Sequence, residues 1–286
     1  MKQVLGSFRD PEAKVFEIDN KIIRAIYQKG ESKFKYLREK KIIKKSIDKN
    51  FLIETDFLEN ENLKKDLNCS FLLKHKKVPY ISYPYEWSFE QLKDAALHHL
   101  RFNIFLLEKD FELTDASSYN IQFIGNKPIF IDAFSLDRYN EGANWLGHNQ
   151  FCQQFLNPLL ITSKKGILYN DWFQGSLEGI SNNDVSKTLS LFQKLSPTIL
   201  FNIVLPTYFE RKNKNKKIDD LKVLKERKKN FNKNSYLWIL KNLRNYIEKL
   251  KGPEEISFWK NYDVENTYSD QQLDKKKEIV SKFISK

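Results

Sequence analysis

The stretch that decides the fold is TDASSYNIQFIGNKPIFIDAF, which runs from Thr114 to Phe134. Asn120 follows Asp115 by five residues, and Asp132 ends the apolar run PIFID. The residues between Asn120 and Asp132 read as strand, turn and strand, with GNK at the turn. A hairpin of this kind reverses the direction of the chain and brings its two ends together. We therefore expect Asp132 to come back to the loop that carries Asp115 and Asn120.

Two readings of this stretch are open. Asp and Asn are ordinary turn residues, so Asp115 and Asn120 alone indicate only a turn. An Asp and an Asn are also the hard oxygen ligands that suit Mg²⁺, which takes few ligands from protein and the rest from phosphate and water. The position of Asp132 after an apolar strand favours the second reading, a site for a metal and a phosphate.

A long buried helix is predicted immediately before this stretch. Ser88 is placed as the N-cap, and Gln91 completes a capping box at the start of the apolar segment SFEQLKDAALHHLRFNIFLLEKDF. Further upstream, residues 6–26 read as two strands joined by a turn at Asp19-Asn20, and FLIETDFL and LLKHKKVPYISYPYEW are also strand-like. Between them, ESKFKYLREKKIIKKSIDKN predicts one basic amphipathic helix.

Helices are predicted after Phe134. HNQFCQQFLNPLLIT and NNDVSKTLSLFQKLSP each read as one helix. The Lys-rich run 209–234 is interpreted as a solvated linker or loop, and a nucleic-acid patch is the less favoured alternative because no binding module is recognisable. NSYLWILKNLRNYIEKLKGP predicts a strong helix whose apolar stripe is expected to pack on its neighbours. The stripe consists of Tyr236, Leu240, Leu243, Ile247 and Leu250.

Composition limits the class of protein. The 286 residues are 41% hydrophobic, which is enough for a packed core in two lobes or domains. The net charge of +12 is compatible with anionic partners, although the lysines are spread along the chain as on a solvated surface. Two cysteines without a CxxC pattern, no secretory signal and no apolar run long enough to span a membrane predict a cytoplasmic protein.

The order of elements in residues 6–200 resembles the protein-kinase-like fold, in the style of small-molecule and aminoglycoside phosphotransferases. The resemblance implies an α+β, bilobal protein. Residues 1–85 would form a small β-rich N-lobe. Residues 86–208 would form a mostly helical C-lobe with the catalytic-type loop 114–134, and residues 209–286 a helical extension.

The same resemblance assigns roles. Asp115 would be the catalytic base, and Asn120 and Asp132 would bind the Mg²⁺ of Mg–ATP. YISYPYEWS resembles a kinase hinge, which makes Ser82 and Tyr83 nucleotide-binding residues. Arg24 would stand where kinases place the phosphate-binding lysine, Glu39 would be its helix partner, and residues 6–9 would cover the phosphates.

A narrower resemblance is to the N-terminal region of bacterial nodulation-type, SAM-dependent methyltransferase proteins. It rests on QLKDAALHHL, LTDASSYNIQF, PIFIDAFSL and FCQQFLNPL, and near the C-terminus on Trp259, Tyr262, Tyr268 and Lys275–Val280. It implies a methyltransferase domain as partner, in cis or in trans. Because the chain has no glycine-rich SAM loop, SAM is not expected to bind to it.

Two classes of function follow. The first is a phosphotransferase that uses Mg–ATP on a hydroxyl of a small molecule or glycan, since no long activation segment for a protein substrate follows Phe134. The second is a degenerate module that binds substrate for, or docks with, a methyltransferase. Leu113 in place of the catalytic-loop histidine, Phe134 in place of the glycine of D-F-G and the missing VAIK lysine favour the second class.

Overall fold

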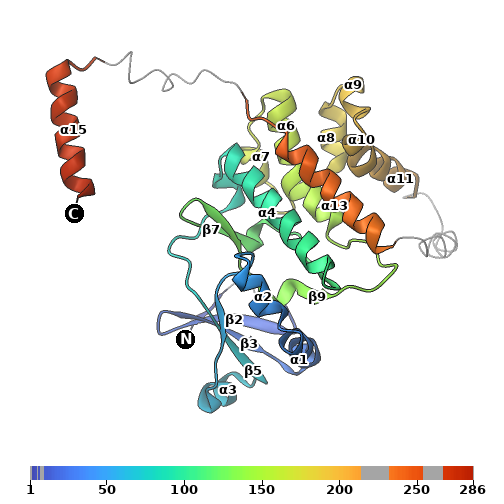
Figure 1. Cartoon of the computed structure of the whole chain (residues 1–286). Coiled ribbons are helices and arrows are strands. Elements are labelled where there is room, and N and C mark those ends of the chain that lie inside the picture. Colours follow the sequence, from blue (N-terminus) through green and yellow to red (C-terminus); the bar gives the residue numbers. More distant parts are fainter. Residues whose placement is uncertain (1, 5, 7–9, 214–231, 254–266, 286) are drawn as a thin grey trace. The chain divides into compact units, whose positions relative to one another are not determined.

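The computed structural model describes residues 2–4, 6, 10–213, 232–253 and 267–285 (Figure 1). The chain divides into two compact units, Met1–Gly252 and Pro253–Lys286. The lobes expected at 1–85 and 86–208 therefore both fall within the first unit. Residues 7–9 of the predicted phosphate-covering loop, Trp259, Tyr262 and most of the Lys-rich run lie outside the described residues.

The N-terminal part forms a five-stranded antiparallel sheet, which contains the predicted hairpin of residues 6–26. The first strand of this hairpin begins only at Ala13, and the strand Lys2–Gln3 was not predicted. Asp19 and Asn20 make the predicted turn, and both have positive φ angles, 48° and 61°. The LLKHKKVPYISYPYEW segment is a strand only as far as His75, and residues 76–83 connect it to the helical part. The strand order is β1 (Lys2–Gln3), β2 (Ala13–Ile18), β3 (Lys21–Ile26), β5 (Phe71–His75) and β4 (Thr55–Phe57).

The single basic helix predicted from ESKFKYLREKKIIKKSIDKN is wrong. The structure has two helices instead, α1 (Glu31–Glu39) and α2 (Ile42–Asp48). Lys41 lies between them in the left-handed conformation, with φ 55° and ψ 26°, so the helical path is interrupted there. The break lets Leu37 and Ile42 both reach the core. The short helix α3 (Glu61–Leu67) precedes β5.

The capped helix α4 (Phe89–Leu107) is confirmed. The Ser88 hydroxyl accepts a hydrogen bond from the Gln91 N–H, and the Gln91 side chain accepts one from the Ser88 N–H at 2.9 Å. These two bonds satisfy backbone donors that the first turn of a helix leaves free. Most of α4 is buried, and it lies beside α13 (Lys233–Glu248) in Figure 1.

The decisive stretch is held between two small sheets. β6 (Phe111–Leu113) pairs with β9 (Leu136–Arg138), and β7 (Ile121–Ile124) pairs with β8 (Lys127–Phe130). Gly125 forms the β7–β8 turn with a φ of 62°, which glycine adopts without strain. The predicted hairpin is therefore confirmed. Short 3₁₀ turns η4 (Ser118–Asn120) and η5 (Ala133–Ser135) precede and follow the hairpin. A third, η3 (Pro84–Glu86), lies between the connector 76–83 and α4.

The helices after Phe134 differ from the prediction in length. The first predicted helix runs on past Pro158 to Lys165 and contains a π-helical segment, η6. The second predicted helix is split, because Ser190 caps a new one. The elements are α5 (His148–Phe151), η6 (Cys152–Leu156), α6 (Asn157–Lys165), α7 (Asn170–Gln174), α8 (Asn182–Thr188), α9 (Leu191–Lys194), α10 (Pro197–Ile199), η7 (Leu200–Val204) and α11 (Leu205–Asn213).

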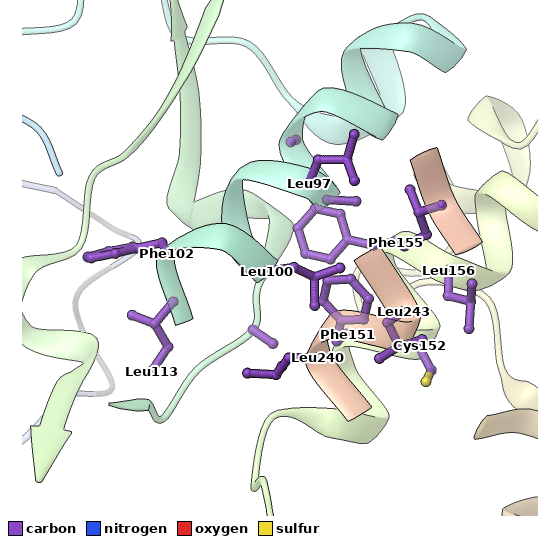
Figure 2. Packing of buried hydrophobic residues seen from close by; sticks show 14 of the residues in the cluster. Leu97, Leu100, Phe102, Leu113, Phe151, Cys152, Phe155, Leu156, Leu240 and Leu243 are labelled. Atoms are coloured by element: carbon purple, nitrogen blue, oxygen red, sulfur yellow. The ribbon is translucent and has the colours of Figure 1, made fainter. Parts of the chain in front are cut away.

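The main core surrounds α4. Figure 2 shows Leu97 and Leu100 of α4 beside Phe151 and Phe155, with Leu240 and Leu243 of α13 nearby. The predicted stripe of α13 is thus confirmed as buried, and α4 is the helix that it packs on. Each buried side chain of this size contributes roughly 1.5–3 kcal/mol to folding. A helix that contributes four or five of them is an integral part of the unit.

The second unit contains α15 (Asp270–Ile284). Ser269 and Gln272 form its capping box, and none of its residues is buried within the described part of the chain. The KKKEIV segment lies on this helix. Within the described ranges, no helix has both the length and the apolar character needed to cross a membrane.

Candidate functional site

An ion pair between a buried arginine and a half-buried aspartate joins the sheet to the decisive stretch. Arg24 on β3 places Nη2 2.7 Å from Oδ1 of Asp132, which follows β8. The same carboxylate accepts hydrogen bonds from the Phe134 N–H at 3.1 Å and the Ser135 hydroxyl at 2.5 Å. Burial raises the pKa of Asp132, but Arg24 and the two hydrogen bonds outweigh it, so the pKa is lowered. Asp132 is therefore a carboxylate with its charge compensated.

His75 orients the guanidinium. The Nε–H of Arg24 donates to Nε2 of His75 at 3.3 Å, and Nδ1 of His75 lies 2.9 Å from the Thr55 hydroxyl. Burial and the adjacent Arg24 lower the pKa of His75 to about 3. The ring is therefore neutral, with Nε2 as the acceptor. Sequence reasoning did not assign His75 to the site. The only signal was its place at the inward position of a strand that pairs with β3.

Asp115 lies on the loop between β6 and η4. Its carboxylate accepts from the Ser117 N–H and from the Asn120 side-chain amide, both at 2.9 Å. Burial raises its pKa, and the negative charge of Asp132 raises it further. The two aspartates therefore lie close enough to interact, and the hairpin brings both ends of the stretch together. Asn120 joins them as expected, but its amide N–H₂ is directed to Asp115.

Two glutamines hold this loop in place. The Gln150 side-chain oxygen accepts from the Ala116 N–H at 2.9 Å. The Gln154 side-chain oxygen accepts from the Ser118 N–H at 2.8 Å and from the Ser118 hydroxyl at 2.9 Å. The two glutamines are four residues apart on α5 and η6, so they lie on one face. Sequence reasoning missed them, although the spacing in QFCQQF was the available signal.

Gln122 of β7 forms two hydrogen bonds with the segment 80–88, which was predicted to resemble a kinase hinge. The Ser82 N–H donates to the Gln122 side-chain oxygen at 2.9 Å, and the Gln122 amide donates to the Ser82 carbonyl at 2.9 Å. Gln122 is only 3% exposed, and Trp87 donates to the Ser82 hydroxyl. Tyr83 is 44% exposed and stacks on Tyr85. Both backbone groups of Ser82 are thus engaged within the chain.

Glu39 is not brought to this site. It is exposed at the end of α1 and pairs with Lys40 at 3.1 Å, whereas the partners of Arg24 are His75 and Asp132. The residue of the loop that does reach α1 is Phe134. Its ring lies in a small apolar cluster of the sheet and α1. The members of that cluster are Ala13, Ile26, Phe34, Leu73 and Phe134.

The arrangement does not fit a resident Mg²⁺. Asn120 and Asp132 are the residues that would hold it, but both oxygens of Asp132 are engaged by Arg24, Phe134 and Ser135. A divalent cation would have to compete with a guanidinium for the same carboxylate. Within the described ranges, no group of three or more His, Cys, Asp or Glu side chains is arranged to hold a metal ion.

Comparison with known proteins finds a relative of this chain. The chain is similar to the nodulation protein NoeA of Rhizobium meliloti (strain 1021). The two are 34% identical over 287 aligned positions, which cover 99% of this chain and 59% of NoeA. The chain therefore spans less than two thirds of the length of NoeA. No family model matches the chain. The similarity supports the nodulation-protein part of the narrower resemblance, and its methyltransferase part stays a prediction.

Proposed function

We propose that this chain is a kinase-like module that does not use Mg–ATP, and that binds substrate for, or docks with, a methyltransferase domain in cis or in trans. The observation that carries the proposal is the pair of hydrogen bonds between Ser82 and Gln122. In the kinase-like resemblance, Ser82 lies where the backbone would bind the nucleotide base. Its donor and acceptor are already paired.

The chemistry of Gln122 explains why this pairing opposes a nucleotide. A primary amide presents one donor and one acceptor side by side, as the edge of a nucleobase does. A base would have to displace Gln122 and leave a nearly buried amide without its partners. Leaving buried polar groups unpaired costs about 1–3 kcal/mol each. The affinity for a base at Ser82 is therefore expected to be weak.

Arg24 supports the same conclusion at the opposite end of the site. Its Nη2 lies 2.7 Å from Asp132, and its Nε is held by His75. The guanidinium already supplies the positive charge that a metal–phosphate complex would bring. Leaving the buried Arg24 guanidinium without its counter-charge costs several kcal/mol. Asp132 is thus better explained as a structural partner of Arg24 than as a metal ligand.

The similarity to NoeA supports a candidate for the partner. The matched region is 59% of NoeA, so the remaining part of NoeA is the natural candidate for a domain that such a module contacts. That this part is a methyltransferase is implied only by the resemblance in the sequence. A calorimetric titration of this chain with that part of NoeA tests whether the two dock. Formation of a stoichiometric complex supports docking, and the absence of any complex contradicts it.

The alternative function is a phosphotransferase acting on a hydroxyl of a small molecule or glycan. One observation favours it. Asp115, the candidate base, has a raised pKa because of burial and the neighbouring Asp132, and a base with a pKa nearer to the working pH is more effective. Asp115 also lies with Asn120 and Asp132 in the order that the kinase-like resemblance requires.

Titration with Mg–ATP separates the two functions. The wild-type chain is expected to give no binding heat at about 5 mM nucleotide. This result means a dissociation constant above about 5 mM, which is a binding free energy weaker than about −3 kcal/mol. Gln122→Leu should expose the Ser82 backbone and allow measurable binding, while the exposed control Gln28→Ala should not. If the wild type binds Mg–ATP with a dissociation constant below about 1 mM and transfers phosphate to any acceptor, the non-catalytic proposal is overturned.

A further inference from the structure

We infer that the partner domain proposed above docks on an aromatic surface of η7, α11 and α13, through an apolar protein segment that carries carboxylates. The inference rests on the docking function proposed above. It adds where on this chain docking takes place and what the partner presents. The aromatic surface consists of Phe201, Tyr208, Phe209 and Trp238. It shares no residue with the candidate site.

The helical run 197–213 is apolar on two sides. It consists of α10, η7 and α11 in direct succession, and its inner side buries Ile199 and Ile203 in the main core. Its outer side carries Phe201, Tyr208 and Phe209, which are 57%, 56% and 54% exposed. The outer side of a surface helix is normally polar. Three accessible aromatic rings on this side therefore indicate a surface that a partner covers.

Trp238 of α13 extends this surface to a second helix. It is 61% exposed and lines the same cavity as Phe201. The cavity has a volume of about 480 Å³, and α10 packs against α13 next to it. The aromatic surface therefore has a hollow between Trp238 and Phe201. Pockets flanked by tryptophan and other aromatic rings are typical places for the anchoring side chain of a protein partner.

The length of the surface indicates a protein segment instead of a small molecule. Tyr208 and Phe209 do not line the cavity. Phe209 lies eight positions after Phe201 in the helical run, which is about 12 Å along a helix. A small molecule that fills the cavity leaves Tyr208 and Phe209 in water. A helical or extended segment can place one side chain in the cavity and cover both of these rings as well.

The charges beside the aromatic rings are mainly positive. Lys241 follows Trp238 by three positions, and Lys212 follows Tyr208 by four, so each lysine lies on the same side of its helix as the aromatic residue. Both lysines are exposed, and neither forms an ion pair within the described ranges. Together, α11 and α13 carry five basic and two acidic residues. A partner with carboxylates at the edge of its apolar segment complements these charges.

His148 adds a positive charge to the lining of the cavity. Burial lowers the pKa of His148, but Cys152 and Asn202 raise it to about 9. The ring is therefore protonated at neutral pH, and both of its nitrogens are donors. Nε2 donates to Asn202 Oδ1 at 2.7 Å, whereas Nδ1 has no acceptor among the described residues. None of the residues that line the cavity is Asp or Glu, so a carboxylate that enters it meets the imidazolium without a competitor.

The same charges disfavour a second copy of this chain, and the hollow disfavours a membrane. In a two-fold contact the surface would face itself, so Lys212, Lys241 and His148 would approach their own copies in a chain of net charge +12. An anionic bilayer would suit the lysines and the aromatic rings. It offers no side chain to fill the cavity between Trp238 and Phe201. A protein segment with carboxylates satisfies both the charge and the shape.

The test titrates this whole chain with the part of NoeA outside the matched region and follows binding by calorimetry. Trp238→Ala should raise the dissociation constant at least about tenfold, and Phe201→Ala several-fold, since each variant removes a ring beside the cavity. The double variant Lys212→Glu with Lys241→Glu should raise it several-fold at low salt. The effect of this charge reversal should shrink at about 0.5 M NaCl, where exposed charges are screened.

Two matched variants are the controls. Tyr80→Ala removes an aromatic ring that is 72% exposed on the connector 76–83, and Lys44→Glu reverses an exposed charge on α2. Both should bind like the wild type. Because every substituted side chain is accessible, all the variants should keep the melting temperature of the wild type.

The outcomes separate this inference from the docking function itself. If the wild type forms a complex and Trp238→Ala binds equally well, the surface is wrong and docking stands. If the wild type forms no complex, the docking function is contradicted and the inference falls with it. A wild-type dimer that Trp238→Ala dissociates in sedimentation experiments would assign the surface to a second copy. Binding to phosphatidylcholine vesicles with about 30% phosphatidylglycerol, lost in the double lysine variant, would assign it to a membrane. Either of these two results overturns the inference.

Discussion

The buried Arg24 and the half-buried Asp132 form an ion pair of 2.7 Å between β3 and the end of the β7–β8 hairpin. Because His75 accepts a hydrogen bond from Nε of the same guanidinium, Arg24 is held at two of its nitrogens. Asp132→Asn should therefore destabilise the chain by about 3–5 kcal/mol, since it leaves a buried guanidinium without its counter-charge. Chemical denaturation measures this change.

The double variant Arg24→Met with Asp132→Asn is the control for this prediction. It removes both charges, so it should recover most of the stability lost by Asp132→Asn alone. Equal destabilisation by the single and the double variant would mean that the ion pair is not what makes Asp132 important.

Glu112 should make stability depend on pH. It is 5% exposed and accepts a hydrogen bond from the Tyr236 hydroxyl at 3.2 Å, and burial raises its pKa from 4.5 to about 7. Between pH 4.5 and 7 the folded state therefore binds more protons than the unfolded state. Stability falls as pH rises through this window, by about 3 kcal/mol in total.

Glu112→Gln tests this dependence. The amide keeps an acceptor for Tyr236 but does not ionise, so the variant should be more stable than the wild type at pH 8 and similar to it at pH 4.5. Melting temperatures across the range measure the effect. A wild-type slope that persists unchanged in Glu112→Gln would assign the pH dependence to another group.

Leu243→Asp tests the packing of α13 on α4. Leu243 is fully buried in the main core, so the variant places an unpaired carboxylate among apolar side chains and should cost several kcal/mol. Lys241→Asp, on the exposed side of the same helix, should have little effect. Similar melting temperatures for the two variants would contradict the burial of this stripe.

Gly30→Ala tests how closely Phe134 approaches the sheet and α1. A Cβ atom at Gly30 would lie 2.9 Å from Cζ of Phe134 and 2.9 Å from the backbone oxygen of Glu12. Because the backbone oxygen cannot move aside easily, we expect a loss of about 1–3 kcal/mol. Gly175→Ala is the control, since its nearest neighbours would be 3.6 Å away and its φ of −73° suits alanine. Unfolding by denaturant should separate the two, and a neutral Gly30→Ala would show that both the Glu12 backbone and Phe134 can shift.

Local patterns in the sequence were enough for the elements that depend on near neighbours. The Ser88–Gln91 capping box, the Asp19-Asn20 turn and the stripe of α13 were all readable, because caps, turns and helical periodicity involve residues only a few positions apart. The break at Lys41 was not readable in the same way. Basic and apolar residues continue across it, and tertiary packing of Leu37 and Ile42 decides where the helix ends.

The same distinction between local patterns and tertiary packing applies to the candidate site. The sequence by itself determined that Asp115, Asn120 and Asp132 meet, because a short hairpin connects them. Only the tertiary structure decided their partners. Arg24 and His75 are 51 residues apart, and Ser82 and Gln122 are 40 residues apart. Pairings at such distances depend on how strands and connectors are placed in space, and no local propensity records that placement.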